Sequence, residues 1–142
     1  MARVEIDMPD EFPFETELEV FSAFINAAGH MGNDSLVTLL NEARTRFMRA
    51  SGAGKLLPTG TYLINADSAL IYRSEAFYGD RLRFQVTATD FHKVGCDIVS
   101  RVTHAESGKE VALAKAGMIY FDNETHKVLH LPAEFREKIS SF

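Results

Sequence analysis

A single long helical pattern followed only by strand patterns is the feature that most constrains how this chain can fold. Apolar residues recur at spacings of three and four between Asp34 and about Ala50, as in an amphipathic helix. These residues are Leu36, Leu39, Leu40, Ala43, Phe47 and Ala50. Asn33 or Asp34 is the expected N-cap, and Gly52 and Gly54 end the pattern. The apolar stripe must be buried, and the rest of the chain offers mainly strands to cover it.

Strand patterns rich in β-branched and aromatic residues dominate the second half of the chain. They cover residues 61–77, 82–91, 96–105 and 110–122. Mostly short turns separate these segments, so neighbouring strands should pair antiparallel. Polar and apolar side chains alternate at the start of residues 15–25, and the segment then becomes mainly apolar, which also predicts a strand. The predicted fold class is α+β, one long central helix on a curved antiparallel sheet of about five strands, as a single domain over residues 1–142.

Two details of this expected fold concern packing. Ala112, Ala114 and Ala116 share one face of the last strand, where their small side chains would let a helix approach closely. The tail from Pro132 to Phe142 is predicted to be a short helical or extended appendage.

Charge and cysteine content narrow the class of protein. The net charge is −5, so no overall basic field would recruit nucleic acid or an anionic membrane. No apolar run reaches the roughly 18 residues of a membrane span, and the acidic start does not resemble a signal peptide. Cys96 is the only cysteine, which excludes an intramolecular disulfide and favours a reducing compartment. These features predict a cytoplasmic protein.

The segment INAAGHMGND, residues 25–34, sets a polar elbow directly against the helix start. Gly29 and Gly32 bracket His30 there, and glycines let a ligand approach the backbone closely. A helix N-terminus offers unpaired amides and a partial positive charge, so it can stabilise an oxygen that becomes anionic in a transition state. Asp34 and Glu42 lie at the start and two turns along the helix, where a carboxylate could act as base or nucleophile.

Other motif-like stretches do not meet the requirements of their chemistry. SGAGKLL, residues 51–57, lacks the first glycine and the Ser or Thr of a phosphate-binding loop. His126 and His130 are four residues apart but not in a helical pattern, so no metal site is expected there. Cys96 opens a strand and is expected to be a small buried hydrophobe.

Residues 26–48, NAAGHMGNDSLVTLLNEARTRFM, resemble the helix-start signature of hotdog-fold acyl-CoA thioesterases of the 4-hydroxybenzoyl-CoA thioesterase-like branch. Gly29-His30, Asn33 and Glu42-Ala43-Arg44 carry the match. Residues 78–82, YGDRL, resemble the Gly-Asp-x-Leu turn of that family, and residues 116–122, AGMIYFD, resemble its last strand. The resemblance covers about residues 15–125 and implies the hotdog order of elements, the same order reached above from the patterns.

This resemblance implies hydrolysis of an acyl-CoA thioester in a homodimer or dimer of dimers, with sites at the subunit interface. No metal or cofactor is expected, because CoA leaves as a stabilised thiolate. The CoA phosphates would need cations, for which Arg73, Arg81, Arg83 and Lys93 are candidates near strand ends and loops.

One departure concerns the catalytic carboxylate, because Asn26 stands where many family members have Asp. Glu42 is the first substitute base, with Asp34 as another candidate and His30 and Asn26 as groups that could hold water or the thioester carbonyl. The amides of Gly32 and Asn33 would stabilise the oxyanion.

Each candidate also has a purely structural interpretation. Glu42 could pair with Arg46 at i+4, Asp34 could only cap the helix, and His30 could be a loop histidine bonded to the backbone. Asp67 is a further functional candidate, since it could reach a neighbouring subunit's site in a dimer. Two other functions stay open: a non-catalytic acyl-CoA binding or sensing module, and a hydratase, for which Asn26 and His30 make a poor acid–base pair.

Overall fold

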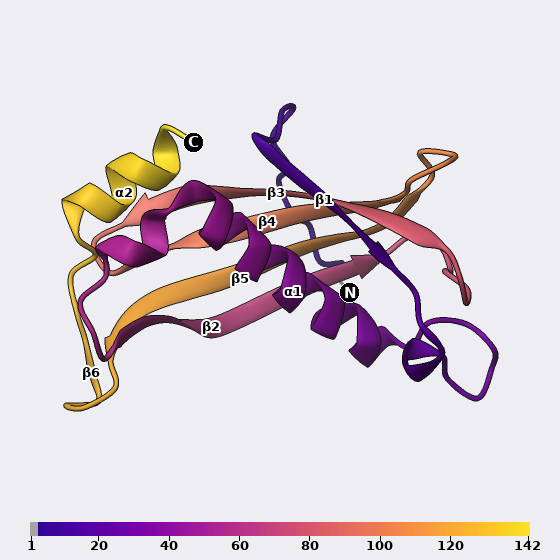
Figure 1. Cartoon of the computed structure of the whole chain (residues 1–142), viewed down its shortest axis with the longest axis horizontal. Helices are drawn as coiled ribbons and strands as arrows, with labels where there is room; N and C mark the ends of the chain where they lie inside the picture. The colour runs from indigo at the N-terminus through magenta and orange to yellow at the C-terminus, as the bar shows by residue number, and fades with distance from the viewer. Residues whose placement is uncertain (1–2) are drawn as a thin grey trace.

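A curled antiparallel sheet wraps one long helix in the computed structural model, which describes residues 3–142 (Figure 1). The helix is α1 (Asn33–Ser51). The strands are β1 (Phe14–Glu19), β2 (Thr61–Tyr72), β3 (Arg81–His92), β4 (Gly95–His104), β5 (Glu110–Asp122) and the short β6 (Lys127–Val128). The order across the sheet is β1-β3-β4-β5-β2, with β6 paired to β5. The predicted fold class, one helix on a curved antiparallel sheet, is confirmed.

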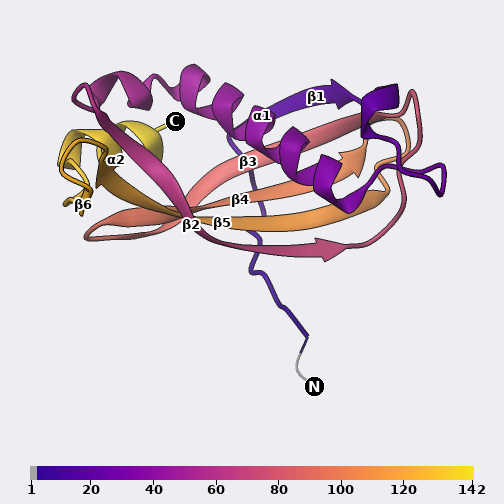
Figure 2. The same cartoon turned by 90° about the horizontal axis from the view of Figure 1, so that it is seen from below.

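Burial on β3 and α1 shows why these segments pack together. Leu82, Phe84 and Val86 of β3 alternate with outward polar residues and are fully buried. The helical stripe that includes Leu36 and Phe47 is buried against this face of the sheet. Figure 2 shows α1 lying along the concave side of the curled sheet, while the N-terminal segment runs on the other side.

The two edges of the sheet differ in how they meet the helix. On the β1 edge, the Arg46 side chain of α1 donates to the Thr16 hydroxyl at 2.8 Å. The β2 edge carries exposed apolar and aromatic side chains, including Tyr62, Ile64 and Tyr72. The helix is therefore tied to β1, while cavities described below separate it from β2.

Two predicted strands are shorter than expected. The strand expected over residues 15–25 ends at Glu19, because Val20 exchanges backbone hydrogen bonds with the turn at Gly79 and Asp80 and the chain then bends into a short 3₁₀ helix, η1 (Ser22–Phe24). The strand expected over residues 61–77 ends at Tyr72, since the backbone amides of the next two residues both donate to the Val111 carbonyl.

The helix boundaries also correct the prediction. Gly32 is the N-cap residue, in extended conformation and without a side-chain cap, so neither Asn33 nor Asp34 holds that position. Gly52 ends α1 in the left-handed region, as glycine at this position commonly does. A second 3₁₀ helix, η2 (Ala53–Leu56), follows.

The C-terminal tail contributes to the core. It forms helix α2 (Ala133–Ser140), and its Phe135 and Ile139 are buried in the main hydrophobic cluster. The predicted short helix is present, but burial of these two side chains makes it part of the packed core instead of an appendage.

Candidate functional site

The elbow before α1 is a closed, hydrogen-bonded loop. The Asn26 amide donates to the His30 carbonyl at 2.9 Å, and the Gly29 amide donates to the Asn26 carbonyl at 3.1 Å. Gly29 has φ of +87°, a conformation that side chains other than glycine adopt at a steric cost. The Met31 amide donates to the Ala76 carbonyl at 2.7 Å, which ties the elbow to the segment after β2.

The amides at the start of α1 are only partly available to a ligand. The Gly32 amide donates to the Phe24 carbonyl at 2.9 Å, and the Asp34 amide is 2.9 Å from Oδ1 of Asn33. The Asn33 and Ser35 amides have no hydrogen-bond acceptor among residues 3–142. Of the two amides predicted to hold the oxyanion, the Asn33 N–H is therefore the free one.

A cavity of about 560 Å³, the elbow cavity, lies between the helix start and the end of β2. Its lining residues are Asn26, His30, Met31, Gly32, Asn33, Leu36, Tyr72, Arg73, Ser74, Glu75, Ala76 and Val111. The fold thus brings together five of the predicted site residues, four from around the helix start (Asn26, His30, Gly32 and Asn33) and Arg73 from beyond β2.

Glu75 is the only carboxylate among these lining residues of the described chain, and the sequence patterns did not point to it. Its Oε1 lies 3.9 Å from Nε2 of His30. Nδ1 of His30 is 3.3 Å from the Met31 carbonyl oxygen, and Nε2 faces Glu75. With the ring proton on Nδ1, this nitrogen donates to the carbonyl and Nε2 is left as an acceptor. The cavity therefore contains a histidine–carboxylate pair, although Asn26 cannot supply a carboxylate.

Tyr72 links the cavity wall to the helix start. Its hydroxyl donates to the Asn33 carbonyl at 3.3 Å. Burial raises the pKa of Tyr72, and the nearby charge of Asp34 raises that pKa further. The hydroxyl therefore remains a donor at neutral pH.

Asn26 lines the elbow cavity, whereas Asp34 is not among its lining residues. Oδ1 of Asn26 accepts from the Ala28 amide at 3.0 Å, an arrangement within the elbow itself. The exposed Asp34 carboxylate lies over Gly32, where an added Cβ would come within 2.5 Å of its Oδ1.

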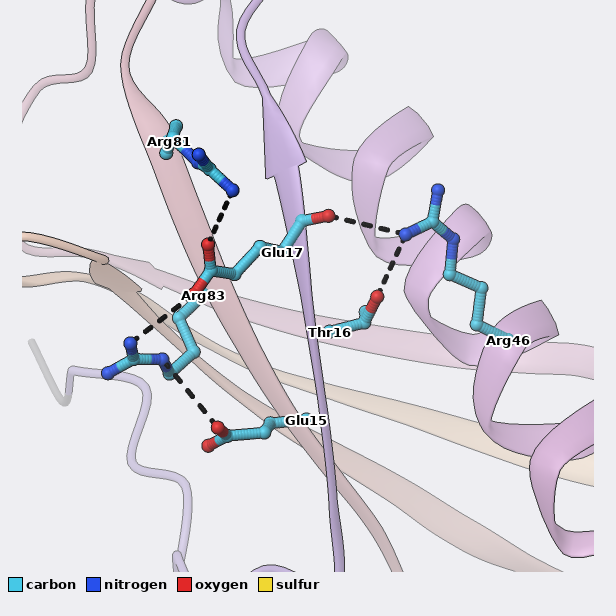
Figure 3. Close-up of polar contacts among 6 residues, drawn as sticks. All are labelled: Glu15, Thr16, Glu17, Arg46, Arg81 and Arg83. Carbon is cyan, nitrogen blue, oxygen red and sulfur yellow. Dashed lines mark hydrogen bonds and ion pairs between the residues drawn. The ribbon is translucent and has the colours of Figure 1, made fainter.

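Glu42 is not brought to the elbow cavity. It lies on the side of α1 nearer β1, where its Oε1 accepts from Nε of Arg46 at 2.9 Å. Arg46 continues to Thr16 and to the Glu17 carbonyl (Figure 3). Within the described chain, the first substitute base predicted from the sequence is therefore in an i,i+4 ion pair away from the cavity.

The predicted phosphate-binding arginines are separated in the structure. Arg81 and Arg83 both pair with Glu17 across β1 and β3, at 3.1 and 3.3 Å (Figure 3). Arg73 is the one of the three that lines the elbow cavity, and its Nε is 3.3 Å from a carboxylate oxygen of Glu110. Arg73, Arg81 and Arg83 therefore do not form one phosphate-binding cluster.

The sequence profile of the Thioesterase-like superfamily matches residues 20–139, which is most of the chain. The chain belongs to this superfamily. The match begins at the end of β1 and includes the elbow, α1 and all later strands, so it confirms the resemblance described above and the expected enzyme class, a thioesterase. No curated protein matches the sequence.

Solved structures confirm the hotdog fold of this superfamily member. A 1,4-dihydroxy-2-naphthoyl-CoA thioesterase from Synechocystis superposes with a TM-score of 0.81 at 20% identity, covering 91% of this chain and 96% of that one. The probable thioesterase YbaW from Escherichia coli has a TM-score of 0.79 at 22% identity, covering 87% and 94%. A Staphylococcus aureus protein solved in complex with CoA has a TM-score of 0.79 at 18% identity, covering 96% and 87%. Within residues 3–142, no helix is long and apolar enough to cross a membrane.

Proposed function

We propose that this protein hydrolyses an acyl-CoA thioester to a free acid and CoA in the elbow cavity. The observation that carries the proposal is the free Asn33 N–H at the start of α1, beside a cavity that contains the His30–Glu75 pair. In this proposal the thioester carbonyl oxygen accepts from the Asn33 N–H. Donors of this kind stabilise the tetrahedral oxyanion more strongly than the ground-state carbonyl.

Glu75 takes the place of the missing family carboxylate in this mechanism. Nε2 of His30 and Oε1 of Glu75 are 3.9 Å apart, and a water between them could donate one hydrogen to each. The water oxygen attacks the carbonyl carbon, and its proton passes to Glu75. The C–S bond then breaks, CoA leaves as a thiolate, and Glu75 returns the proton to the sulfur or to solvent. His30 is the positioning residue that orients the water.

Arg73 and Asn26 have supporting roles in the same proposal. Among the residues of the described chain that line the elbow cavity, Arg73 is the one arginine or lysine, so it is the candidate for a CoA phosphate. Asn26 lines the cavity, and its side-chain NH2 donates no hydrogen bond within residues 3–142, so it can hold the thioester carbonyl but cannot act as base.

A homodimer formed through β2 is part of the proposal. β2 is an edge strand of the sheet and exposes Tyr62, Ile64 and Tyr72, with exposed fractions of 55%, 40% and 52%. An apolar edge of this kind favours pairing with another strand. Because the elbow cavity adjoins the end of β2, a partner subunit paired there would complete one wall of the site. A dimer of dimers is the larger assembly proposed.

The test is release of free CoA thiol from a panel of short-chain, long-chain and aromatic acyl-CoA substrates. Cys96 is buried and burial raises its pKa to about 12, so it does not react with the thiol reagent while the protein is folded. This free, buried cysteine also supports the proposed cytoplasmic location. Turnover with at least one thioester is expected. Absence of turnover across the panel would contradict the proposal.

A second candidate function is a non-catalytic acyl-CoA binding protein. Asn26 in place of the family carboxylate favours it, as does the exposed position of Glu75, whose side chain is 63% exposed. Binding of a non-hydrolysable CoA thioether without any thiol release from the matching thioester would support this function. Hydration of an enoyl-CoA by the His30–Glu75 pair, followed by absorbance, would instead indicate a hydratase.

A further inference from the structure

Three cavities follow one another along α1, namely the elbow cavity, a narrow cavity and a far cavity beside the C-terminal half of the helix, and we call this row the α1–β2 groove. Its helix wall carries residues spaced by three or four positions, which places them on one face. These are Asn33, Val37, Asn41, Arg44 and Met48. Its strand wall is Tyr72, Leu70, Ser68, Asn65 and Leu63 of β2.

The floor of the middle part of the groove is made of side chains that are small or apolar. They are Ile98, Ser100, Ala114 and Ala116. This part is narrow, with a volume of about 80 Å³, and the far cavity beside the C-terminal half of α1 has a volume of about 770 Å³. Two of the alanines expected to let a helix approach the sheet thus lie below the groove. A chain that enters at the elbow cavity meets mainly apolar surface along this path.

Arg44 lies where the narrow part meets the far cavity, because it lines both. Arg44 is partly buried, and burial lowers its pKa. Within residues 3–142 its guanidinium makes one hydrogen bond, from Nη2 to Oδ1 of Asn41 at 2.9 Å. It forms no ion pair with a carboxylate in residues 3–142. Five N–H donors of a partly desolvated cation are therefore met by one neutral acceptor.

The charge around Arg44 is of one sign. Arg49 and Lys55 also line the far cavity, and neither forms an ion pair within the described chain. No Asp or Glu is among the lining residues of the far cavity or of the narrow part. In a protein with a net charge of −5, this local excess of cations is complementary to an anion.

The distance along the helix sets the size of the ligand. Arg44 follows Asn33 by eleven residues, so its Cα is about 16 Å farther along α1. An acyl group bound with its carbonyl at the Asn33 N–H would need a medium or long chain to bring its far end to the guanidinium.

We propose that the α1–β2 groove binds acyl groups that carry a carboxylate at the end opposite the thioester, and that Arg44 binds this carboxylate. The inference rests on the proposed thioesterase function and specifies its substrate class. The apolar methylene chain lies over Val37, Leu70 and the alanine floor. The terminal carboxylate accepts from the Arg44 guanidinium, whose planar geometry allows two parallel hydrogen bonds.

The experiment compares two CoA thioesters of equal chain length, dodecanedioyl-CoA and dodecanoyl-CoA, with the wild type, Arg44→Gln and Arg44→Lys. The wild type is expected to have the higher kcat/KM for dodecanedioyl-CoA. Arg44→Gln should lower the ratio of the two kcat/KM values by about 10- to 100-fold, the range for loss of a hydrogen bond to a charged group. Arg44→Lys should retain part of the preference. Arg3→Gln, an exposed arginine outside the groove, is the matched control and should leave the ratio unchanged.

Binding of the free acids separates this inference from the proposed function. Calorimetry with dodecanedioate and dodecanoate measures the same preference without turnover, so a protein that hydrolyses no thioester still tests the groove. Equal affinity of the wild type for the two acids would overturn the inference. An equal decrease for both substrates in Arg44→Gln would also overturn it, because a CoA phosphate at Arg44, or a subunit contact revealed by light scattering, would affect both alike.

Discussion

The two long sides of α1 differ in how their charged groups are satisfied. On the side nearer β1, Arg46 contacts Glu42, Thr16 and the Glu17 carbonyl within the chain. On the side nearer β2, Arg44 has one neutral acceptor and lines both the narrow part of the groove and the far cavity. The paired charges on the β1 side therefore stabilise the fold. In our proposal, the Arg44 guanidinium on the β2 side is available to a ligand. Substitutions on the β1 side are therefore expected to change stability, and substitutions on the β2 side are expected to change activity.

The largest effect is expected from Glu75→Gln on the β2 side. Glutamine keeps a hydrogen-bond acceptor near His30 but cannot take a proton from water. We expect kcat for the best thioester to fall by about 10²–10⁴-fold, the usual contribution of a general base. Steady-state thiol release measures this, with thermal unfolding to show that the variant is folded. A kcat within twofold of the wild type would remove Glu75 from the mechanism.

Arg46→Met should reduce stability without affecting catalysis. The variant keeps much of the apolar stem but loses the hydrogen bonds to Thr16 and to the Glu17 carbonyl. Since these groups are partly exposed, the expected loss in free energy of unfolding is about 1 kcal/mol. Denaturant titration measures this value. A fall in kcat with unchanged stability would contradict this expectation, because it would give Arg46 a role in catalysis.

Tyr72→Phe should have a smaller effect, seen at high pH. The raised pKa of Tyr72 means that its neutral form is favoured in the folded state. The unfolded chain therefore ionises first as pH rises above about 10, and the folded protein loses stability until its own raised pKa is passed. Tyr72→Phe should remove this part of the loss. Parallel melting curves of the two proteins between neutral and alkaline pH measure it, and identical pH dependence would show that Tyr72 does not contribute.

Glu42→Gln is expected to have the smallest effect. It removes an exposed i,i+4 ion pair with Arg46, which contributes at most about 0.5 kcal/mol. Its kcat should match that of the wild type. Loss of turnover in this variant would instead indicate that Glu42 is the catalytic base, as first predicted from the sequence.

The general fold could be predicted because its signals are local and periodic. The stripe from Leu36 to Phe47 and the alternation on β3 each identify the buried face of one element. The end of β1 could not be predicted in this way, because backbone contacts of Val20 with the Gly79–Asp80 turn end the strand earlier than its apolar sequence suggests. The buried packing of Phe135 and Ile139 of α2 likewise depends on long-range contacts.

The site was only partly predictable for the same reason. The elbow was visible as Gly29 and Gly32 directly before a helix, and its position beside a cavity follows from the fold. Glu75 had no such signal, since it was expected inside a strand and reaches His30 only because β2 ends at Tyr72. Glu42 was two turns along the correct helix but on the other side of it, which depends on how the whole helix is rotated against the sheet.

A crystal structure with a non-hydrolysable 2-oxoalkyl-CoA thioether of the best substrate, which keeps the carbonyl and has a methylene between it and the sulfur, tests the central claim most directly. We predict that the carbonyl oxygen of the analogue lies about 2.7–3.1 Å from the Asn33 amide nitrogen, with the acyl chain in the α1–β2 groove. An analogue bound on the side of α1 nearer β1, next to Glu42 and Arg46, would contradict the claim, as would a carbonyl oxygen without contact to the start of the helix.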